Sequence, residues 1–193
     1  MTEPADLTNT ACGFIALVGA PNAGKSTLLN SLVGTKVSIV THKAQTTRSQ
    51  VRGVLTLDQT QLVFVDTPGV FTPKRRLDRA MVESAWGGAG DSDIVAFIVD
   101  AERGIVPEIE LLIEGLENHR QPKVLILNKI DQVKREKLLE LSQEINSRLR
   151  FEATFMLSAL KGDGVKDFID WCVKHAPPGP WHFPEDHLTD LTM

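Results

Sequence analysis

The sequence has 193 residues, of which 42% are hydrophobic and 24% are charged, and these values are ordinary for a soluble globular protein. The net charge of −4 excludes an overall basic field that would draw the whole chain onto nucleic acid. The two cysteines lie far apart and show no metal-ligand spacing. The first ten residues lack the basic start and the apolar segment of a secretory signal, so we expect a cytoplasmic location.

Short apolar runs alternate along the chain with stretches of helical periodicity. Strands are expected, in order, over 14–19, 51–57, 61–65, 94–99, 124–127 and 154–157, and helices over 25–33, 107–116, 138–149 and 165–173, with a weaker helical pattern over 77–85. Only the second and third strands lack a helix between them. The pattern predicts an α/β fold with a mostly parallel six-stranded sheet, one antiparallel edge strand and helices on both faces.

A glycine-rich loop lies between the first expected strand and the first expected helix. Residues 19–26 read Gly-Ala-Pro-Asn-Ala-Gly-Lys-Ser and fit the G-x-x-x-x-G-K-S/T pattern of phosphate-binding loops. We expect the two glycines to let the backbone wrap closely around a polyphosphate, whose oxygens face the N–H groups of the loop and the helix start. Lys25 is predicted to reach the β- and γ-phosphates, and Ser26 to bind Mg²⁺. The residues predicted to contact the nucleotide here are Asn22, Ala23, Gly24, Lys25, Ser26 and Thr27.

Two other strand ends carry polar residues. Asp66 directly follows the 61–65 strand, where its carboxylate can help to hold Mg²⁺ through water, and Gly69 can present its N–H group to a γ-phosphate. Asn128-Lys129-Ile130-Asp131 follows the 124–127 strand. The Asp131 carboxylate can accept hydrogen bonds from N1–H and N2–H₂ of guanine, and adenine has no donor at either place. The two strand ends therefore predict a site for a guanine nucleotide.

The remaining base-binding expectations concern neighbours of Asp131. Asn128 is expected to tie loops together near the base, and the stem of Lys129 is expected to cover the ring. Ser158 and Ala159 end the last expected strand, where a backbone N–H group could reach the guanine O6.

These motifs, in this order, resemble the translation-factor-related class of P-loop GTPases. Two runs are more specific: Lys43-Ala44-Gln45-Thr46-Thr47-Arg48, and the closing segment that begins His182-Phe183-Pro184-Glu185-Asp186. They resemble the Era family of bacterial ribosome-assembly GTPases, in the TrmE-Era-like group, over about residues 13–190. The resemblance implies a P-loop NTPase fold with a Ras-like G domain over 13–178, preceded by a flexible N-terminal tail over 1–12.

The resemblance also implies roles for single residues in GTP hydrolysis. Val70 stands where many small GTPases carry the glutamine that orients water, so we expect slow intrinsic turnover. Residues 43–50 and 69–90 resemble the two switch segments. Thr47, in preference to Thr46, would bind Mg²⁺ with Ser26 and Asp66, and Asn22 matches an asparagine that helps to bind K⁺ in relatives. The implied catalytic residues are Lys25, Thr47, Gly69 and Asn22.

For the whole protein the resemblance implies action in small (30S) ribosomal subunit assembly and 16S rRNA maturation. RNA would be bound mainly through a C-terminal KH domain that this sequence does not contain. Residues 179–193 would begin the linker, with Trp181 and Phe183 docked on that linker or missing domain, or exposed. We expect a monomer, and the resemblance leaves open a peripheral association with the inner face of the cell membrane.

Two alternatives to this function remain open. One is a related GTPase with another RNA client, in tRNA modification or large-subunit assembly. The other is a nucleotide-binding switch module with negligible intrinsic hydrolysis, which Val70 keeps open.

Overall fold

The computed structural model describes residues 10–33, 37, 38, 50–66 and 92–183. The strands are β1 (Ala11–Gly19), β2 (Val37–Ser38), β3 (Gln50–Leu57), β4 (Thr60–Asp66), β5 (Ile94–Asp100), β6 (Lys123–Asn128) and β7 (Ala153–Leu157). The helices are α1 (Lys25–Val33), α3 (Pro107–Glu117), α4 (Arg135–Arg148) and α5 (Val165–His175), with a short 3-10 turn at Ile130–Gln132.

The strands form one sheet with the order β2-β3-β4-β1-β5-β6-β7. β1 pairs in parallel with β4 and β5, and β6 continues the parallel set to β7. β3 is antiparallel to both of its neighbours. The predicted α/β fold with a mostly parallel sheet is confirmed. The sheet differs from the expectation by β2, a two-residue strand outside β3 that is too short to show periodicity in the sequence.

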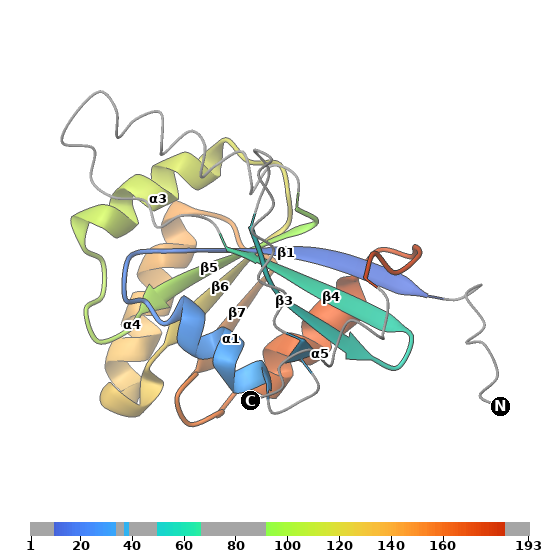
Figure 1. Cartoon of the computed structure of the whole chain (residues 1–193). Coiled ribbons are helices and arrows are strands. Elements are labelled where there is room, and N and C mark those ends of the chain that lie inside the picture. Colours follow the sequence, from blue (N-terminus) through green and yellow to red (C-terminus); the bar gives the residue numbers. More distant parts are fainter. Residues whose placement is uncertain (1–9, 34–36, 39–49, 67–91, 184–193) are drawn as a thin grey trace, which may run out of the picture.

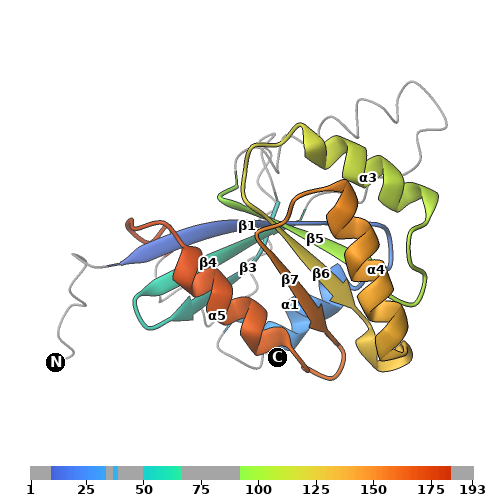
Figure 2. The same cartoon turned by 180° about the vertical axis from the view of Figure 1, so that it is seen from behind.

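The central strands β5 and β6 are buried on both faces, which explains why they read as continuous apolar runs. Ile15 and Leu17 pack on one face with the buried residues of α1 and α5, and Ala16 and Val18 pack on the other face with those of α3 and α4. The two helix pairs can be followed on either side of the sheet in Figure 1 and, from behind, in Figure 2. Within the described residues, none of the helices is both long and apolar enough to cross a bilayer.

The boundaries of the elements differ in detail from the expectation. The helix over 25–33 is confirmed. β1 begins at Ala11, inside the segment 1–12 that we expected to form a tail, because Ala11 and Cys12 pair with the first residues of β4. Apart from Gln50, which begins β3, the switch segments lie outside the described residues, as does the helical pattern over 77–85.

The segment after α5 folds back along the start of β1, as the red loop beside the blue strand in Figure 1 shows. The Gly179 N–H group donates to the Thr10 carbonyl (3.0 Å), and Trp181 Nε1 donates to the Gln59 carbonyl (3.1 Å). Phe183 packs against a small cluster of buried side chains, Cys12, Val54, Val63 and Val65. Trp181 and Phe183 were expected on the linker, on a further domain or in solvent. Phe183 instead docks on the small apolar cluster, and the N–H group of Trp181 finds its acceptor at the Gln59 carbonyl.

Candidate nucleotide-binding site

The phosphate-binding loop joins β1 to α1 at the carboxyl edge of the sheet. Its turn requires two residues in the left-handed region, Asn22 with φ 63° and Gly24 with φ 99°. No acidic residue lies in the first turn of α1, whereas α4 and α5 each carry one there and α3 carries two. Because carboxylates compete with a bound anion at a helix start, α1 is the described helix best suited to receive a phosphate.

The two glycines of the loop are required by protein neighbours. A Cβ at Gly24 would lie 2.1 Å from Asn128 Nδ2, and a Cβ at Gly19 would lie 2.6 Å from the Ile98 carbonyl oxygen of β5. The close wrapping of the backbone around a polyphosphate, which the sequence predicts for these glycines, stays a prediction. The structure shows that the glycines let the loop approach β5 and the base-binding loop, which is a physical need of the protein fold itself.

Lys25 lies over its own loop. Its Nζ atom donates to the carbonyl oxygens of Gly19 (2.9 Å) and Ala20 (3.1 Å), which keeps the ammonium group at the mouth of the loop. Ser26 and Thr27 follow on the exposed first turn of α1. This arrangement is suited to the predicted phosphate and Mg²⁺ contacts, which stay predictions.

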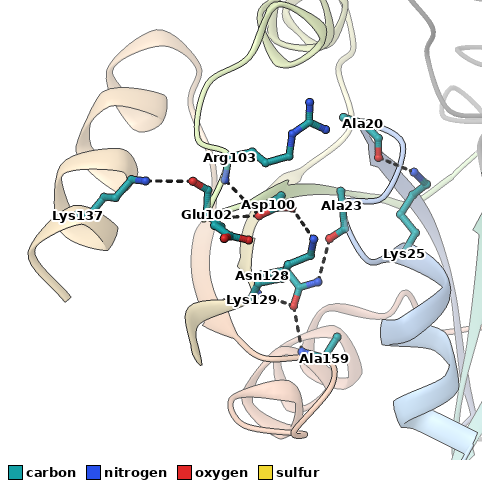
Figure 3. Close-up of polar contacts among 10 residues, drawn as sticks. All are labelled: Ala20, Ala23, Lys25, Asp100, Glu102, Arg103, Asn128, Lys129, Lys137 and Ala159. Atoms are coloured by element: carbon teal, nitrogen blue, oxygen red, sulfur yellow. Dashed lines mark hydrogen bonds and ion pairs between the residues drawn. The ribbon is translucent and has the colours of Figure 1, made fainter. Parts of the chain in front are cut away.

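Asn128 joins three separate parts of the site (Figure 3). Its Nδ2 atom donates to the Ala23 carbonyl of the phosphate-binding loop at 2.9 Å. Its Oδ1 atom accepts hydrogen bonds from the N–H groups of Lys129 (2.8 Å) and Ala159 (3.0 Å). The side chain is buried, with 2% of the residue exposed, so these bonds satisfy an amide that would otherwise be costly to bury. The expectation that Asn128 ties loops together is confirmed.

Asp131, predicted to read the guanine edge, is held by its neighbours. Ser158 Oγ donates to Asp131 Oδ1 at 2.7 Å, and Lys161 Nζ lies 3.7 Å from Oδ2. The hydrogen bond from Ser158 is the main cause that lowers the pKa of the Asp131 carboxyl below its ordinary value. The group therefore stays a carboxylate, the form that can accept two hydrogen bonds from guanine.

The loop after β7 was expected to offer an N–H group to guanine O6. In the structure the Ser158 N–H group donates to the Asp163 carbonyl (2.9 Å), and the Ala159 N–H group donates to Asn128 Oδ1. A bond to guanine would therefore have to share the Ala159 N–H group with Asn128. In the structure this loop orients Asn128 and the Asp131 carboxylate. Its contact with the base stays a prediction.

Asp66 is the last residue of β4, and its Cα pairs with that of Leu17 in β1, two residues before the phosphate-binding loop begins. Its backbone thus lies at the same edge as the loop. The described residues hold no group of three or more His, Cys, Asp or Glu side chains that could bind a metal ion. The predicted Mg²⁺ ligands are of another kind, since they include Ser26 together with Thr47 and Asp66. Thr47 and Gly69 lie outside the described residues.

One residue of the site was missed by the sequence reasoning. Asp100 ends β5 at the carboxyl edge, and its carboxylate is buried and paired with Lys129 Nζ at 2.5 Å. Its signal was present, because an acidic residue directly after an apolar strand is the same pattern that pointed to Asp66. No motif contains it, and the sequence reasoning therefore assigned it no role.

The comparison with known families agrees with this geometry. The family described as 50S ribosome-binding GTPase matches residues 14–129, which is more than half of the chain. The chain belongs to this GTPase family. The match runs from β1 through the phosphate-binding loop to Lys129, whereas Asp131 and the loop after β7 follow the matched segment.

Relatives within this GTPase family are named Era. GTPase Era of Mesorhizobium japonicum is 59% identical over 191 residues, which are 99% of this chain and 62% of the relative. A solved Era in complex with MgGDPNP and nucleotides 1506–1542 of 16S ribosomal RNA is 38% identical, with a TM-score of 0.75, and the alignment covers 95% of this chain and 63% of that one. Aquifex aeolicus Era with bound GDP·AlF4⁻ is also 38% identical, with a TM-score of 0.74 and the same coverage.

These relatives confirm the predicted resemblance to the Era family. The chain spans a little over three fifths of their length, since it covers 62% of the M. japonicum protein and 63% of each solved Era.

Proposed function

We propose that this chain binds GTP and GDP with Mg²⁺, hydrolyses GTP slowly and acts as a nucleotide-dependent switch of the Era type. The observation that carries the proposal is the position of Asn128, which bonds to the phosphate-binding loop and to the loop after β7 while Asp131 follows it three residues later. The phosphate site and the guanine site are thereby held in one fixed arrangement.

The chain's own residues supply positioning and charge for the hydrolysis. The first-turn N–H groups of α1 and the Lys25 ammonium would stabilise negative charge that develops on the transferred phosphoryl group. Mg²⁺ would be held by Ser26 together with Asp66 and Thr47, and would neutralise phosphate charge. Phosphoryl transfer needs little covalent chemistry from the protein, so this preorganised arrangement is the main contribution expected from the chain.

A K⁺ ion beside Asn22 is a finer part of the proposal. Asn22 is exposed at the turn of the loop with φ 63°, which leaves its side chain available to solvent and ligands. An amide oxygen is a suitable ligand for a hard cation. A cation at this place would add positive charge near the phosphates, where Val70 cannot orient water as a glutamine does.

For the complete protein we infer a role in small-subunit assembly, with 16S rRNA bound mainly through a KH domain outside this sequence. Support comes from the solved Era that carries a 16S rRNA fragment. The second candidate is a large-subunit client, which is favoured by the family description that names the 50S subunit. The name of the relative at 59% identity favours the Era type over this alternative.

The test is a competition for bound fluorescent mant-GDP by GTP, GDP and ATP, on the wild type and on Asp131→Asn. A guanine-reading carboxylate predicts that ATP competes at least about 1000-fold less well than GDP and that Asp131→Asn loses most of its GDP affinity. Asp170→Asn, at an exposed aspartate of α5, is the matched control and should bind as the wild type does. Equal displacement by ATP would overturn the proposed guanine specificity.

A further inference from the structure

Asp100 is an acidic side chain buried at the edge of the site. Only 6% of the residue is exposed, and it follows six buried apolar residues of β5. A buried carboxylate is strongly destabilising unless charged or hydrogen-bonding partners surround it. The partners of Asp100 therefore indicate what this carboxylate does.

The two carboxylate oxygens of Asp100 have different partners. Oδ1 accepts the N–H groups of Glu102 (3.0 Å) and Arg103 (3.3 Å), which fixes the turn after β5. Oδ2 pairs with Lys129 Nζ at 2.5 Å. Lys137, another cation near this turn, donates to the Glu102 carbonyl at 3.0 Å, as Figure 3 shows. The second oxygen is thus committed to the lysine of the base-binding loop.

The backbone brings Lys129 to this carboxylate. β5 and β6 pair so that Asp100 lies opposite Asn128, and the Ala101 N–H group donates to the Asn128 carbonyl at 3.0 Å. Lys129 then adopts a left-handed conformation with φ 66°, which is unfavourable for a residue with a Cβ. The Lys129 N–H group is held by Asn128 Oδ1, and its Nζ atom by Asp100, so both ends of the lysine are fixed.

We propose that Asp100 is a positioning residue for the guanine nucleotide and acts by holding Lys129 in the conformation that covers the base. The inference rests on the proposed function. A lysine side chain has many rotamers, and ordering them when the nucleotide binds would weaken binding. Asp100 removes that cost in advance, because the ion pair already fixes the stem of Lys129 beside Asn128.

The first experiment measures the rate of mant-GDP release from Asp100→Asn. Asparagine keeps Oδ1 as the acceptor for the turn, but its Nδ2 group cannot accept a hydrogen bond from Lys129. The variant therefore removes the pair with Lys129 and keeps the bonds to the turn. We expect release to become roughly tenfold faster, since a lost preorganising contact appears mainly in the dissociation rate. Asp170→Asn, which breaks the exposed Lys166–Asp170 pair on α5, is the matched control and should release mant-GDP as the wild type does.

The second experiment repeats the measurement in the Lys129→Met background. Methionine keeps an apolar stem but carries no charge, so Asp100 has no ammonium group left to hold. If Asp100 acts through Lys129, Asp100→Asn should then change the release rate less than twofold, a coupling that a purely structural turn would not show.

Two results would overturn the proposal. One is a wild-type release rate for a folded Asp100→Asn, with folding checked by thermal unfolding. The other is an equal acceleration with and without the Lys129 charge. If the wild type itself does not bind mant-GDP, the proposed function and this inference fail together. In the two results above the wild type binds mant-GDP, and only this inference fails.

Discussion

Two buried side-chain amides lie at opposite edges of the sheet, and each holds segments outside the helices and strands in place by hydrogen bonds. Asn128 ends β6 at the carboxyl edge and is 2% exposed, and Gln61 lies near the start of β4 at the amino edge and is 1% exposed. Gln61 Oε1 accepts the N–H groups of His182 (3.0 Å) and Phe183 (3.1 Å), and its Nε2 atom donates to the Phe183 carbonyl (2.8 Å).

The difference between the two amides lies in what they join. Asn128 connects three loops that each follow a strand of the parallel sheet, where ligands bind in folds of this class. Gln61 binds one segment and covers the small apolar cluster around Cys12. The same chemistry therefore organises a binding site at one edge and anchors a terminal segment at the other. The role of each amide thus depends on the edge of the sheet at which it lies.

The largest expected effect comes from Asn128→Ala. The Ala23 carbonyl and the Ala159 N–H group would each lose a buried partner, which costs about 1–3 kcal/mol per group. The phosphate and guanine loops would no longer be held together, so we expect GDP affinity to fall about 100-fold, or about 2.7 kcal/mol. Titration with mant-GDP measures this loss, with Asn118→Ala on the exposed end of α3 as the control. Unchanged affinity in Asn128→Ala would refute its organising role.

Gln61→Ala should have an intermediate effect of a different kind. The variant removes three hydrogen bonds to residues 182 and 183, and the segment can then leave the surface and bond to water. We expect a loss of about 1–2 kcal/mol in the free energy of unfolding, with GDP affinity unchanged within about twofold.

The readout of Gln61→Ala is the Cys12 thiol, which lies 3.8 Å from Gln61 Oε1 and is buried in the native protein. Its reaction with a thiol reagent should become faster, while that of Cys172 should not change. Gln59 lies at the exposed hairpin turn, and its backbone carbonyl accepts the hydrogen bond from Trp181. Gln59→Ala keeps this carbonyl and should therefore alter neither rate. A loss of GDP affinity in Gln61→Ala would show that the two edges are coupled after all.

The smallest expected effect concerns pH and the main core. Burial raises the pKa of the Cys172 thiol far above its ordinary value. The folded state thus keeps the thiol proton, while an unfolded thiol with a pKa near 8.5 loses it. The contribution of the thiol to the free energy of unfolding is therefore present below that pH and is lost as the pH rises above it. We expect Cys172→Ala to reduce this decline by about 1 kcal/mol per pH unit between pH 9 and 10. The chain has no tyrosine that would titrate in the same range.

Urea unfolding of both proteins at several pH values measures this difference. Cys12→Ala provides the comparison in the small apolar cluster beside β1. Desolvation also raises the pKa of Cys12, but the His182 N–H group partly opposes the shift, so its contribution to the pH slope should be smaller. Equal slopes for the wild type and Cys172→Ala would show that this thiol does not contribute.

Much of the fold and of the site could be predicted from the sequence because each signal is local. A strand buried on both faces gives a continuous apolar run, and the polar residues directly after such runs marked the loops that carry Lys25, Asp131 and Ser158. The two-residue strand β2 and the antiparallel position of β3 second from the edge are not visible in this way, because short strands lack periodicity.

The reasons for individual residues were harder to predict. Gly24 was explained by the phosphate, whereas its nearest neighbour is the amide of Asn128. Asp100 belongs to no motif, and its partner Lys129 lies directly after β6, the next strand of the sheet. Phe183 was placed in a linker, although it docks on the apolar cluster beside β1. In each case the neighbour that matters is distant along the chain.

The sequence by itself determined the class of the fold, the order of its elements and the chemistry available at each strand end, because periodicity and short motifs are properties of neighbouring residues. Only the tertiary structure decided which of these groups meet. The bond from Asn128 to Ala23 spans 105 residues and that from Gln61 to Phe183 spans 122. A hydrogen bond between residues so far apart depends on the packing of the whole sheet and leaves no pattern along the chain.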